Sequence, residues 1–187
     1  AIIITGCSVR GIETSGGSLS KVITEKGSID TSTVLCAAGA WSSYFCRSLG
    51  ISVPQLKVRG TVARTNPIET KINGTIFDKK ISIRKRNDGG YTLAHGSTLD
   101  HAFTPSTLYY SPKYIRALIN EFGVLKLSIG GDFIDELNAP KKWDLDKESP
   151  FERNRVLNPK PNKKTIAQIQ KQLGEVYPEL RDANIVE

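Results

Sequence analysis

Side chains that could bind a carboxylate or transfer a proton lie on both sides of a turn predicted at residues 87–90. Arg84 precedes this turn in an alternating, strand-like run, and Tyr91 and His95 follow it at positions of equal parity. The donor fork of an arginine suits a carboxylate, and a histidine can exchange a proton near pH 7. Arg84, Tyr91 and His95 are therefore candidate substrate contacts, with a solvated arginine and a structural histidine as the alternatives.

Other catalytic chemistries lack their motifs in this sequence. A serine hydrolase would show a GxSxG elbow, and none occurs. His95 and His101 have neither a cysteine companion nor HExxH spacing, so no metal site is expected. A phosphate-binding loop is also absent from the sequence. These patterns identify no catalytic residue.

A second group of residues, at positions 33–42, could hold a ligand. Residues 34–36 form an apolar run that predicts a strand buried on both faces. Residues 37–39 (Ala-Ala-Gly) then remove side-chain bulk, and a helix is expected to follow. Such a turn leaves backbone N–H groups where a polar ligand can approach, although the small residues could equally serve only tight packing. The apolar face and glycine stop of that helix are Trp41, Phe45, Leu49 and Gly50.

The same residues carry a resemblance to a known family. The strings VLCAAGAWS (34–42), LGISVP (49–54) and VRG (58–60) resemble the second flavin-contacting segment of the D-amino-acid oxidase family of FAD-dependent oxidoreductases. The resemblance continues through DGGYTLAHG (88–96) and SPFERNRVLNP (149–159). It therefore covers most of the chain.

The resemblance implies FAD as the cofactor and a set of residues that contact it. In this family the Ala-Gly-Ala-Trp turn lies against the cofactor, and the residue that corresponds to Val9 contacts the adenine through its backbone. The cofactor-binding residues that the resemblance implies are Val9, Ala37, Ala38, Gly39 and Trp41. Without the resemblance, Val9 would be interpreted as an ordinary core valine.

The resemblance also implies an activity, the oxidation of an amino acid, an amine or a related small hydroxy or amino acid by hydride transfer to FAD. Two family features are missing from these residues: the opening GxGxxG turn that holds the FAD pyrophosphate, and the closing glycine-arginine-proline segment. We therefore expect a central fragment that is inactive by itself. The alternative is a non-catalytic subunit or binding module that keeps the fold without FAD.

The expected fold mixes α+β and α/β architecture. Residues 1–55 are expected to form part of a Rossmann-like FAD-binding domain, with the linker near Val53-Pro54. Residues 56–160 are expected to form a substrate-binding domain, an antiparallel sheet with helices on one side. Residues 161–187 are expected to be a helix that returns toward the FAD domain.

Alternating residues between turn signals predict the strands. A strand at residues 7–12 and turns at residues 16–17 and 26–27 predict hairpins in the first domain, and the family resemblance implies that they form its small three-stranded meander. In the second domain we expect strands at residues 76–86, 90–95 and 124–133. The polar, proline-bearing stretch after these strands predicts loops.

Two helices are expected in the later part of the chain. The first begins at Ser111, with Pro112 at its first helical position, and ends at Gly123. The second spans residues 163–176 and ends before Pro178. Their predicted apolar stripes are Tyr114, Ile115, Leu118, Ile119 and Phe122 in the first, and Ile166, Ile169, Leu173 and Val176 in the second.

Composition bounds the class of protein. The 187 residues are 39% hydrophobic and 24% charged, and no apolar run approaches the ~20 residues that span a bilayer, so no transmembrane segment is expected. Three cysteines are an odd number and lack CxxC spacing, which favours a reducing cytoplasm.

The formal net charge of +7 raises nucleic acid, anionic membranes and acidic substrates as partners. The densest basic run, at residues 79–86, alternates like a strand and has no interleaved aromatic residues for base stacking. It therefore predicts a solvated face and no nucleic-acid partner. A small-molecule substrate is the expected partner, and further subunits are left open.

Overall fold

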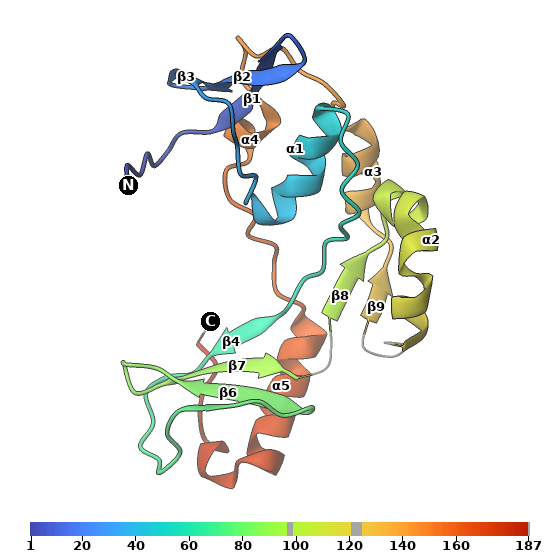
Figure 1. Cartoon of the computed structure of the whole chain (residues 1–187). Helices are drawn as coiled ribbons and strands as arrows, with labels where there is room; N and C mark the ends of the chain where they lie inside the picture. The colour runs from blue at the N-terminus through green and yellow to red at the C-terminus, as the bar shows by residue number, and fades with distance from the viewer. Residues whose placement is uncertain (97–98, 121–124, 187) are drawn as a thin grey trace. The chain divides into compact units, whose positions relative to one another are not determined.

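The computed structural model describes residues 1–96, 99–120 and 125–186 and divides into two compact units (Figure 1). The first unit comprises Ala1–Gln55 and Ile134–Asn158, and the second comprises Leu56–Phe133 and Pro159–Glu187. The chain thus leaves the first unit close to the predicted linker. The later part of the chain differs from the expected domain ranges. Residues 134–158 belong to the first unit, and the chain rejoins the second unit at Pro159.

Three antiparallel strands form the predicted meander of the first unit. β1 (Val9–Ser15), β2 (Ser18–Thr24) and β3 (Gly27–Asp30) pair in that order. Gly16 and Gly17 connect the first two strands with φ values of 58° and 80°, which glycine adopts without a Cβ penalty. Val22 and Thr24 of β2 are 8% and 7% exposed, so their face of the meander is the buried one.

The small-residue stretch of the first unit leads into a helix, as predicted. One turn of 3-10 helix, η1 (Gly39–Trp41), continues directly into α1 (Ser42–Ser48). Gly50 then has a φ of 79°, and the N–H groups of Gly50 and Ile51 donate to the carbonyls of Arg47 and Cys46. These two bonds form a Schellman motif, which confirms the predicted glycine stop.

The predicted buried strand at residues 34–36 is wrong. In the described part of the chain this segment pairs with no strand, and Val34 and Leu35 are 42% and 89% exposed. An apolar run becomes a strand only where a neighbour takes up its backbone hydrogen bonds, and hydrophobic periodicity does not reveal whether that neighbour exists.

Two short helices interrupt the loops that were predicted after residue 131, while residues 139–149 and 154–162 have neither helix nor strand. The helices are α3 (Gly131–Asn138) and α4 (Pro150–Arg153). A capping box begins α4, in which Ser149 and Glu152 satisfy each other's backbone N–H groups. Phe151 of α4 contacts four other rings of the first unit, at centroid separations of 5.4–5.9 Å, namely Trp41, Tyr44, Phe45 and Trp143. These aromatic contacts hold α4 in the first unit.

An antiparallel sheet with the strand order β4-β7-β6-β5 forms the base of the second unit. Its strands are β4 (Val62–Arg64), β5 (Thr75–Ile76), β6 (Ile81–Lys85) and β7 (Tyr91–His95). The turn between β6 and β7 needs its glycines, because Gly89 has a φ of 84° and a Cβ on Gly90 would lie 2.6 Å from the carbonyl oxygen of Thr65. The turn of this hairpin was predicted correctly, but the strand expected at residues 76–86 is interrupted, because residues 75–76 belong to β5 and only residues 81–85 form β6.

The helix α5 (Lys163–Val176) covers one face of this sheet and matches its predicted bounds. Asn162 begins the helix by accepting hydrogen bonds from the N–H groups of Lys164 and Thr165. Ile169 and Leu173 are fully buried against the sheet, and the 3-10 turn η2 (Pro178–Leu180) follows. The buried side chains of α5 therefore pack within the second unit, and the expectation that this helix returns toward the FAD domain stays a prediction.

A separate two-stranded sheet lies in the second unit. β8 (Leu99–Ala102) and β9 (Leu125–Ser128) are parallel, and α2 (Pro105–Asn120) connects them, as a parallel pair requires a crossover. The strand predicted at residues 124–133 is therefore shorter and does not extend the antiparallel sheet. Its first residue, Val124, lies outside the described residues.

The helix α2 begins before its predicted start. Thr104 precedes Pro105 and repeats the same N-cap and proline signal, so Pro112 lies inside the helix. Pro112 has no N–H for the carbonyl of Leu108, and the hydroxyl of Ser111 donates to that carbonyl at 2.9 Å instead. This substitution lets the helix continue through the proline.

The predicted apolar stripe of α2 is not buried. Ile115 and Ile119 are 58% and 68% exposed. The structure does not describe the side chain of Leu118. Phe122 and the predicted stop at Gly123 also lie outside the described residues. None of the described helices is both long and apolar enough to cross a bilayer.

Candidate functional site

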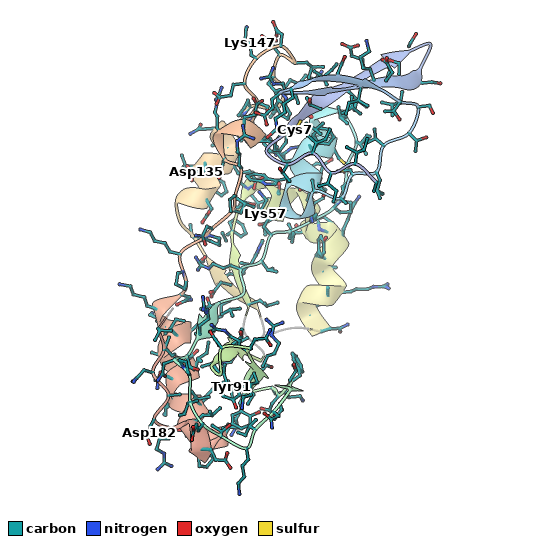
Figure 2. All side chains as sticks on the ribbon, turned by 90° about the vertical axis from the view of Figure 1, so that its left-hand side faces the viewer. Cys7, Lys57, Tyr91, Asp135, Lys147 and Asp182 are labelled. Carbon is teal, nitrogen blue, oxygen red and sulfur yellow. The ribbon has the colours of Figure 1, made fainter. Side chains whose placement is uncertain are left out.

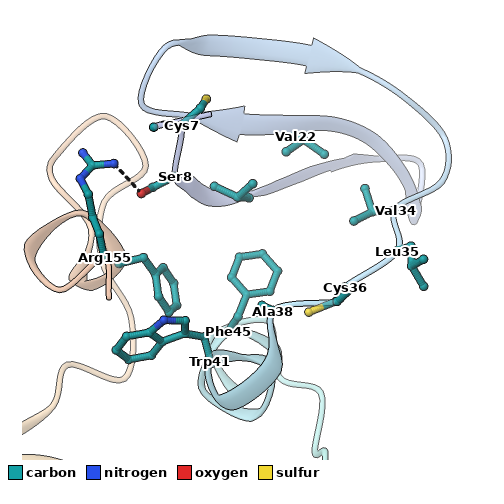
Figure 3. A pocket seen from close by; sticks show the side chains of 14 residues that line it. Cys7, Ser8, Val22, Val34, Leu35, Cys36, Ala38, Trp41, Phe45 and Arg155 are labelled. Carbon is teal, nitrogen blue, oxygen red and sulfur yellow. Dashed lines mark hydrogen bonds between the residues drawn. The ribbon is translucent and has the colours of Figure 1, made fainter. Parts of the chain in front are cut away.

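The first unit contains a pocket of about 580 Å³ between the meander and α1 (Figure 3). This volume is in the range of small-molecule and cofactor sites, roughly 300–1,000 Å³. Loop, strand and helix residues from four parts of the sequence contribute to its wall. They are residues 6–9, Val22, residues 34–38, Trp41, Phe45, Phe151 and Arg155.

Four of the five predicted cofactor residues line this pocket. They are Val9, Ala37, Ala38 and Trp41. Ala37 and Ala38 carry only a methyl group, so a ligand can approach the backbone of this segment closely. The structure thus brings together residues that lie about thirty positions apart in the sequence.

Gly39, the fifth predicted residue, has a different role in the structure. It does not line the pocket, and a Cβ at this position would meet no atom within 4 Å. Its φ of 53° lies in the left-handed region, which disfavours any residue with a Cβ. The conformation of Gly39 therefore sets the entry of the chain into η1, and its contact with the cofactor stays a prediction.

The wall of the pocket is largely apolar. Val9 and Val22 come from the meander, Trp41 and Phe45 from the start of the helical segment, and Phe151 from α4. Apolar and aromatic side chains around a few polar groups are typical of a site for a flat, partly aromatic ligand.

Ser8 and Arg155 form the polar part of the wall (Figure 3). Arg155 Nη1 donates to Ser8 Oγ at 3.2 Å and to Glu25 Oε1 at 2.7 Å, and Arg155 Nη2 donates to Glu25 Oε2 at 2.6 Å. The N–H of Ser8 also donates to Glu25 Oε1, at 2.6 Å. The hydrogen bonds from Arg155 and then Ser8 lower the pKa of Glu25 from 4.5 to about 2, so this carboxylate is ionised at neutral pH.

A second arginine–carboxylate fork also joins the meander to the segment at residues 149–155. Here the meander supplies the arginine and the segment supplies the carboxylate. Arg10 Nε and Nη2 donate to the two carboxylate oxygens of Glu152, each at 2.9 Å. The N–H and hydroxyl of Ser149 also donate to Glu152, each at 2.9 Å. The arginine is the main cause that lowers the pKa of Glu152 to about 2.

Sequence reasoning missed Ser8, Phe151 and Arg155 as pocket residues. The capping box at Ser149 and Glu152 is visible in the sequence and would have predicted a helix there. No local pattern, however, indicates that a segment more than a hundred residues later closes the pocket. That placement depends on the ring contacts and charge pairs of the folded chain.

The structure separates Arg84 from the other two predicted substrate contacts. Arg84 of β6 and Arg64 of β4 both pair with Thr92 of β7. The two arginines therefore lie on one face of the sheet, and both are exposed. Tyr91 and His95 lie on the opposite face, which α5 covers. Neighbouring strand residues point to opposite faces, so Arg84 cannot form one site with Tyr91 and His95 through this sheet.

Tyr91 is a core residue, and its predicted contact with substrate is corrected. Its side chain, labelled in Figure 2, belongs to the second unit. It is 0% exposed. Its hydroxyl is 2.6 Å from Thr70 Oγ1 and donates to the carbonyl of Ile72 at 2.6 Å. Both bonds satisfy the hydroxyl inside the protein, as a buried tyrosine requires.

His95 ends β7 on the same face as Tyr91 and pairs with Ile81. Burial, followed by the nearby charge of Lys126, lowers the pKa of His95 below its ordinary value of 6.5. The imidazole is therefore neutral at pH 7. Among the described residues, no group of three histidine, cysteine or acidic side chains could hold a metal ion.

The profile of one protein family, "DAO: FAD dependent oxidoreductase", matches residues 1–187. The chain belongs to this family of FAD-dependent oxidoreductases. Curated relatives of this DAO-family chain include a D-amino acid dehydrogenase from Rhizobium rhizogenes, 28% identical over 116 residues, which are 52% of this chain and 28% of that protein. A glycine oxidase from Pseudomonas putida is 30% identical over 96 residues, which are 51% of this chain and 26% of that protein.

Solved structures are similar to the DAO-family chain over almost its whole length. An L-amino acid deaminase from Proteus myxofaciens, in complex with anthranilate, aligns with 97% of this chain at a TM-score of 0.88 and 31% identity. The L-amino acid deaminase from Proteus vulgaris aligns with the same share at a TM-score of 0.85 and 27% identity. The chain covers 40% and 42% of these two structures and about a quarter of the curated relatives.

Proposed function

We propose that this chain is the central portion of a flavoenzyme that oxidises an amino acid or a related small amine by hydride transfer to FAD. The observation that carries the proposal is the pocket of the first unit. It combines Val9, Ala37, Ala38 and Trp41, which the family resemblance implies as cofactor contacts.

The residues present in the pocket fit part of a flavin dinucleotide. Flat apolar walls from Trp41, Phe45 and Phe151 suit an aromatic ring system, and the small Ala37 and Ala38 leave backbone groups accessible. Val9 and residues 37–38 would hold the cofactor through backbone contacts. FAD, when bound, supplies the hydride acceptor, and these residues supply its position.

The substrate side of the proposal rests on Arg84. This residue is exposed on the sheet face that α5 leaves open, and no described residue is recorded as its hydrogen-bond or ion-pair partner. A guanidinium with free donors can bind a carboxylate in two parallel hydrogen bonds. We assign Arg84 to the substrate carboxylate, and we assign the second unit to substrate binding and the first to FAD.

The names of the relatives support an amino-acid substrate. They are a D-amino acid dehydrogenase, a glycine oxidase and two L-amino acid deaminases. These names share the amino acid but differ in its stereochemistry, so the proposal stops at that class.

A spectrum of the full-length protein that contains this chain tests the proposal. We expect bound flavin to absorb near ~450 nm and to bleach when a D- or L-amino acid is added without oxygen. A folded full-length protein that neither contains nor takes up FAD would overturn the proposal. That result would favour the alternative function, a non-catalytic subunit or binding module that keeps the fold without FAD. A flavoprotein that no amino acid or amine reduces would overturn only the substrate part.

A further inference from the structure

The turn at residues 149–155 is held in the first unit by two arginine–carboxylate forks of opposite direction. In one fork the meander supplies the arginine, Arg10, and the turn supplies the carboxylate, Glu152. In the other fork the turn at residues 149–155 supplies the arginine, Arg155, and the turn between β2 and β3 supplies the carboxylate, Glu25. The two forks have similar chemistry, but only Arg155 lines the pocket.

Arg155 keeps donors that the protein does not use. A guanidinium carries five N–H donors, and three of those of Arg155 are bonded to Ser8 and Glu25. Nε and one N–H of Nη2 have no recorded acceptor among the described residues, and the side chain is 45% exposed. Glu25 therefore holds the guanidinium in a fixed orientation and leaves part of it available to a ligand.

The position of these donors matters because the rest of the pocket offers few. Val9, Val22, Phe45, Trp41 and Phe151 present apolar side chains. A ligand that fits such a wall and also meets an arginine has a flat ring and an attached oxygen-rich group. An adenine nucleotide has this combination, with hydroxyl and phosphate oxygens that accept from a guanidinium.

We infer that Arg155, fixed by Glu25 and Ser8, binds the nucleotide half of the cofactor, so that the distant turn at residues 149–155 completes the FAD site. The inference rests on the proposed function. Arg155 is a cofactor-binding residue in this scheme, and it contacts the nucleotide and not the reacting flavin ring. Phe151, on the same turn, supplies the apolar contact beside it.

A purely structural role for Arg155 makes a different prediction. If Arg155 only anchors the turn, its loss should resemble the loss of Arg10, which anchors the same turn without facing the pocket. The two forks therefore provide a matched comparison within one protein. Arg153 gives a third variant, because its pair with Glu148 is exposed on both sides, at 64% and 60%.

The test uses the full-length protein after removal of its flavin, with Arg155→Gln, Arg155→Lys, Arg10→Gln and Arg153→Gln variants. The Kd for FAD is measured by quenching of flavin fluorescence, and the Tm of each apoprotein is measured in parallel. AMP serves as a competing probe for the nucleotide half.

We expect Arg155→Gln to weaken FAD binding about tenfold or more and to weaken AMP competition by a similar factor. Arg155→Lys should recover part of this affinity, because it keeps the charge and loses the fork. Arg10→Gln should lower the Tm at least as much as Arg155→Gln and weaken FAD binding less. Arg153→Gln should change neither quantity.

Two results would overturn the inference that Arg155 binds the nucleotide half of FAD, and a third result would reject the proposed function instead. Equal loss of FAD affinity in Arg10→Gln and Arg155→Gln, at equal loss of Tm, would make Arg155 structural. Unchanged Kd values for FAD and AMP in a folded Arg155→Gln variant would also remove Arg155 from the site. A wild-type protein that does not bind FAD would instead reject the proposed function, and the two failures are thereby distinguished.

Discussion

Arg10 donates to both carboxylate oxygens of Glu152, at 2.9 Å each, across 142 residues of sequence. The side chain of Glu152 is only 7% exposed, and Ser149 adds two further hydrogen bonds to it. Burial of a carboxylate is unfavourable unless it is paired, and here all of its pairing comes from within the first unit. This pair and the Arg155–Glu25 fork fix the turn that carries Phe151.

Both forks predict that the first unit loses stability in acid. The folded-state pKa of Glu25 and of Glu152 is about 2, below the value of 4.5 expected in the unfolded chain. Above pH 4.5 both states are ionised and the stabilisation is complete, and as the pH falls toward 2 the unfolded state binds protons first. The Tm of the full-length protein should therefore fall between about pH 4.5 and pH 2.

The Glu25→Gln/Glu152→Gln double variant is the comparison for this acid loss. It should be less stable at pH 7 and should lose less of its Tm on acidification than the wild type. Glu148→Gln is the control, because Glu148 forms an exposed pair that contributes little. Identical acid slopes in wild type and the double variant would show that other groups cause the loss.

Tyr91→Phe should destabilise the second unit without affecting substrate binding. The change removes the hydroxyl that bonds to Thr70 and Ile72 and leaves the carbonyl of Ile72 without this donor. We expect a loss of about 1–3 kcal/mol in the free energy of unfolding, measured by urea denaturation. An unchanged stability with a raised KM would restore Tyr91 as a substrate contact.

Arg84→Gln should raise the KM for the amino acid about tenfold or more and leave flavin content unchanged. Loss of a charge-assisted hydrogen bond to a carboxylate is worth about 1.5–3 kcal/mol, and each 1.4 kcal/mol is tenfold in affinity. Lys79→Gln, which removes an exposed charge from the same basic run, is the control. Equal KM values in Arg84→Gln and Lys79→Gln would show that Arg84 is merely solvated.

Gly39→Ala should lower the Tm through backbone strain alone. Its Cβ would meet no atom, but a φ of 53° costs a residue with a Cβ about 1–2 kcal/mol. Gly50→Ala, at a φ of 79° in the Schellman motif, should behave in the same way. Flavin lost from Gly39→Ala but not from an equally destabilised Gly50→Ala would show that Gly39 approaches the cofactor after all.

His95→Ala distinguishes a structural histidine from a catalytic one. His95 shares the face that α5 covers and is neutral at pH 7, so we expect the variant to lose Tm and keep its flavin spectrum. Turnover of the surviving folded enzyme should be unchanged. A stable variant that has lost kcat/KM would place His95 in the active site instead.

The sequence by itself determined the local elements whose signals are contained in a few residues. The meander follows from its glycine turns, the hairpin from residues 87–90, and α5 from its period and the stop before Pro178. The stop of α1 at Gly50 belongs to the same group. These features were predictable because backbone sterics and side-chain periodicity act over one or two turns of chain.

Only the tertiary structure decided which of these segments meet. Residues 34–36 carry the pattern of a buried strand but have no described partner, and instead they line a pocket. Tyr91 and Arg84 were both predicted as substrate contacts, and the pairing register places them on opposite faces of the sheet. Arg155 reaches the pocket because Glu25 binds it from 130 residues earlier. Long-range contacts of this kind depend on the complementary partner as well as on the local residues, and no local pattern specifies that partner.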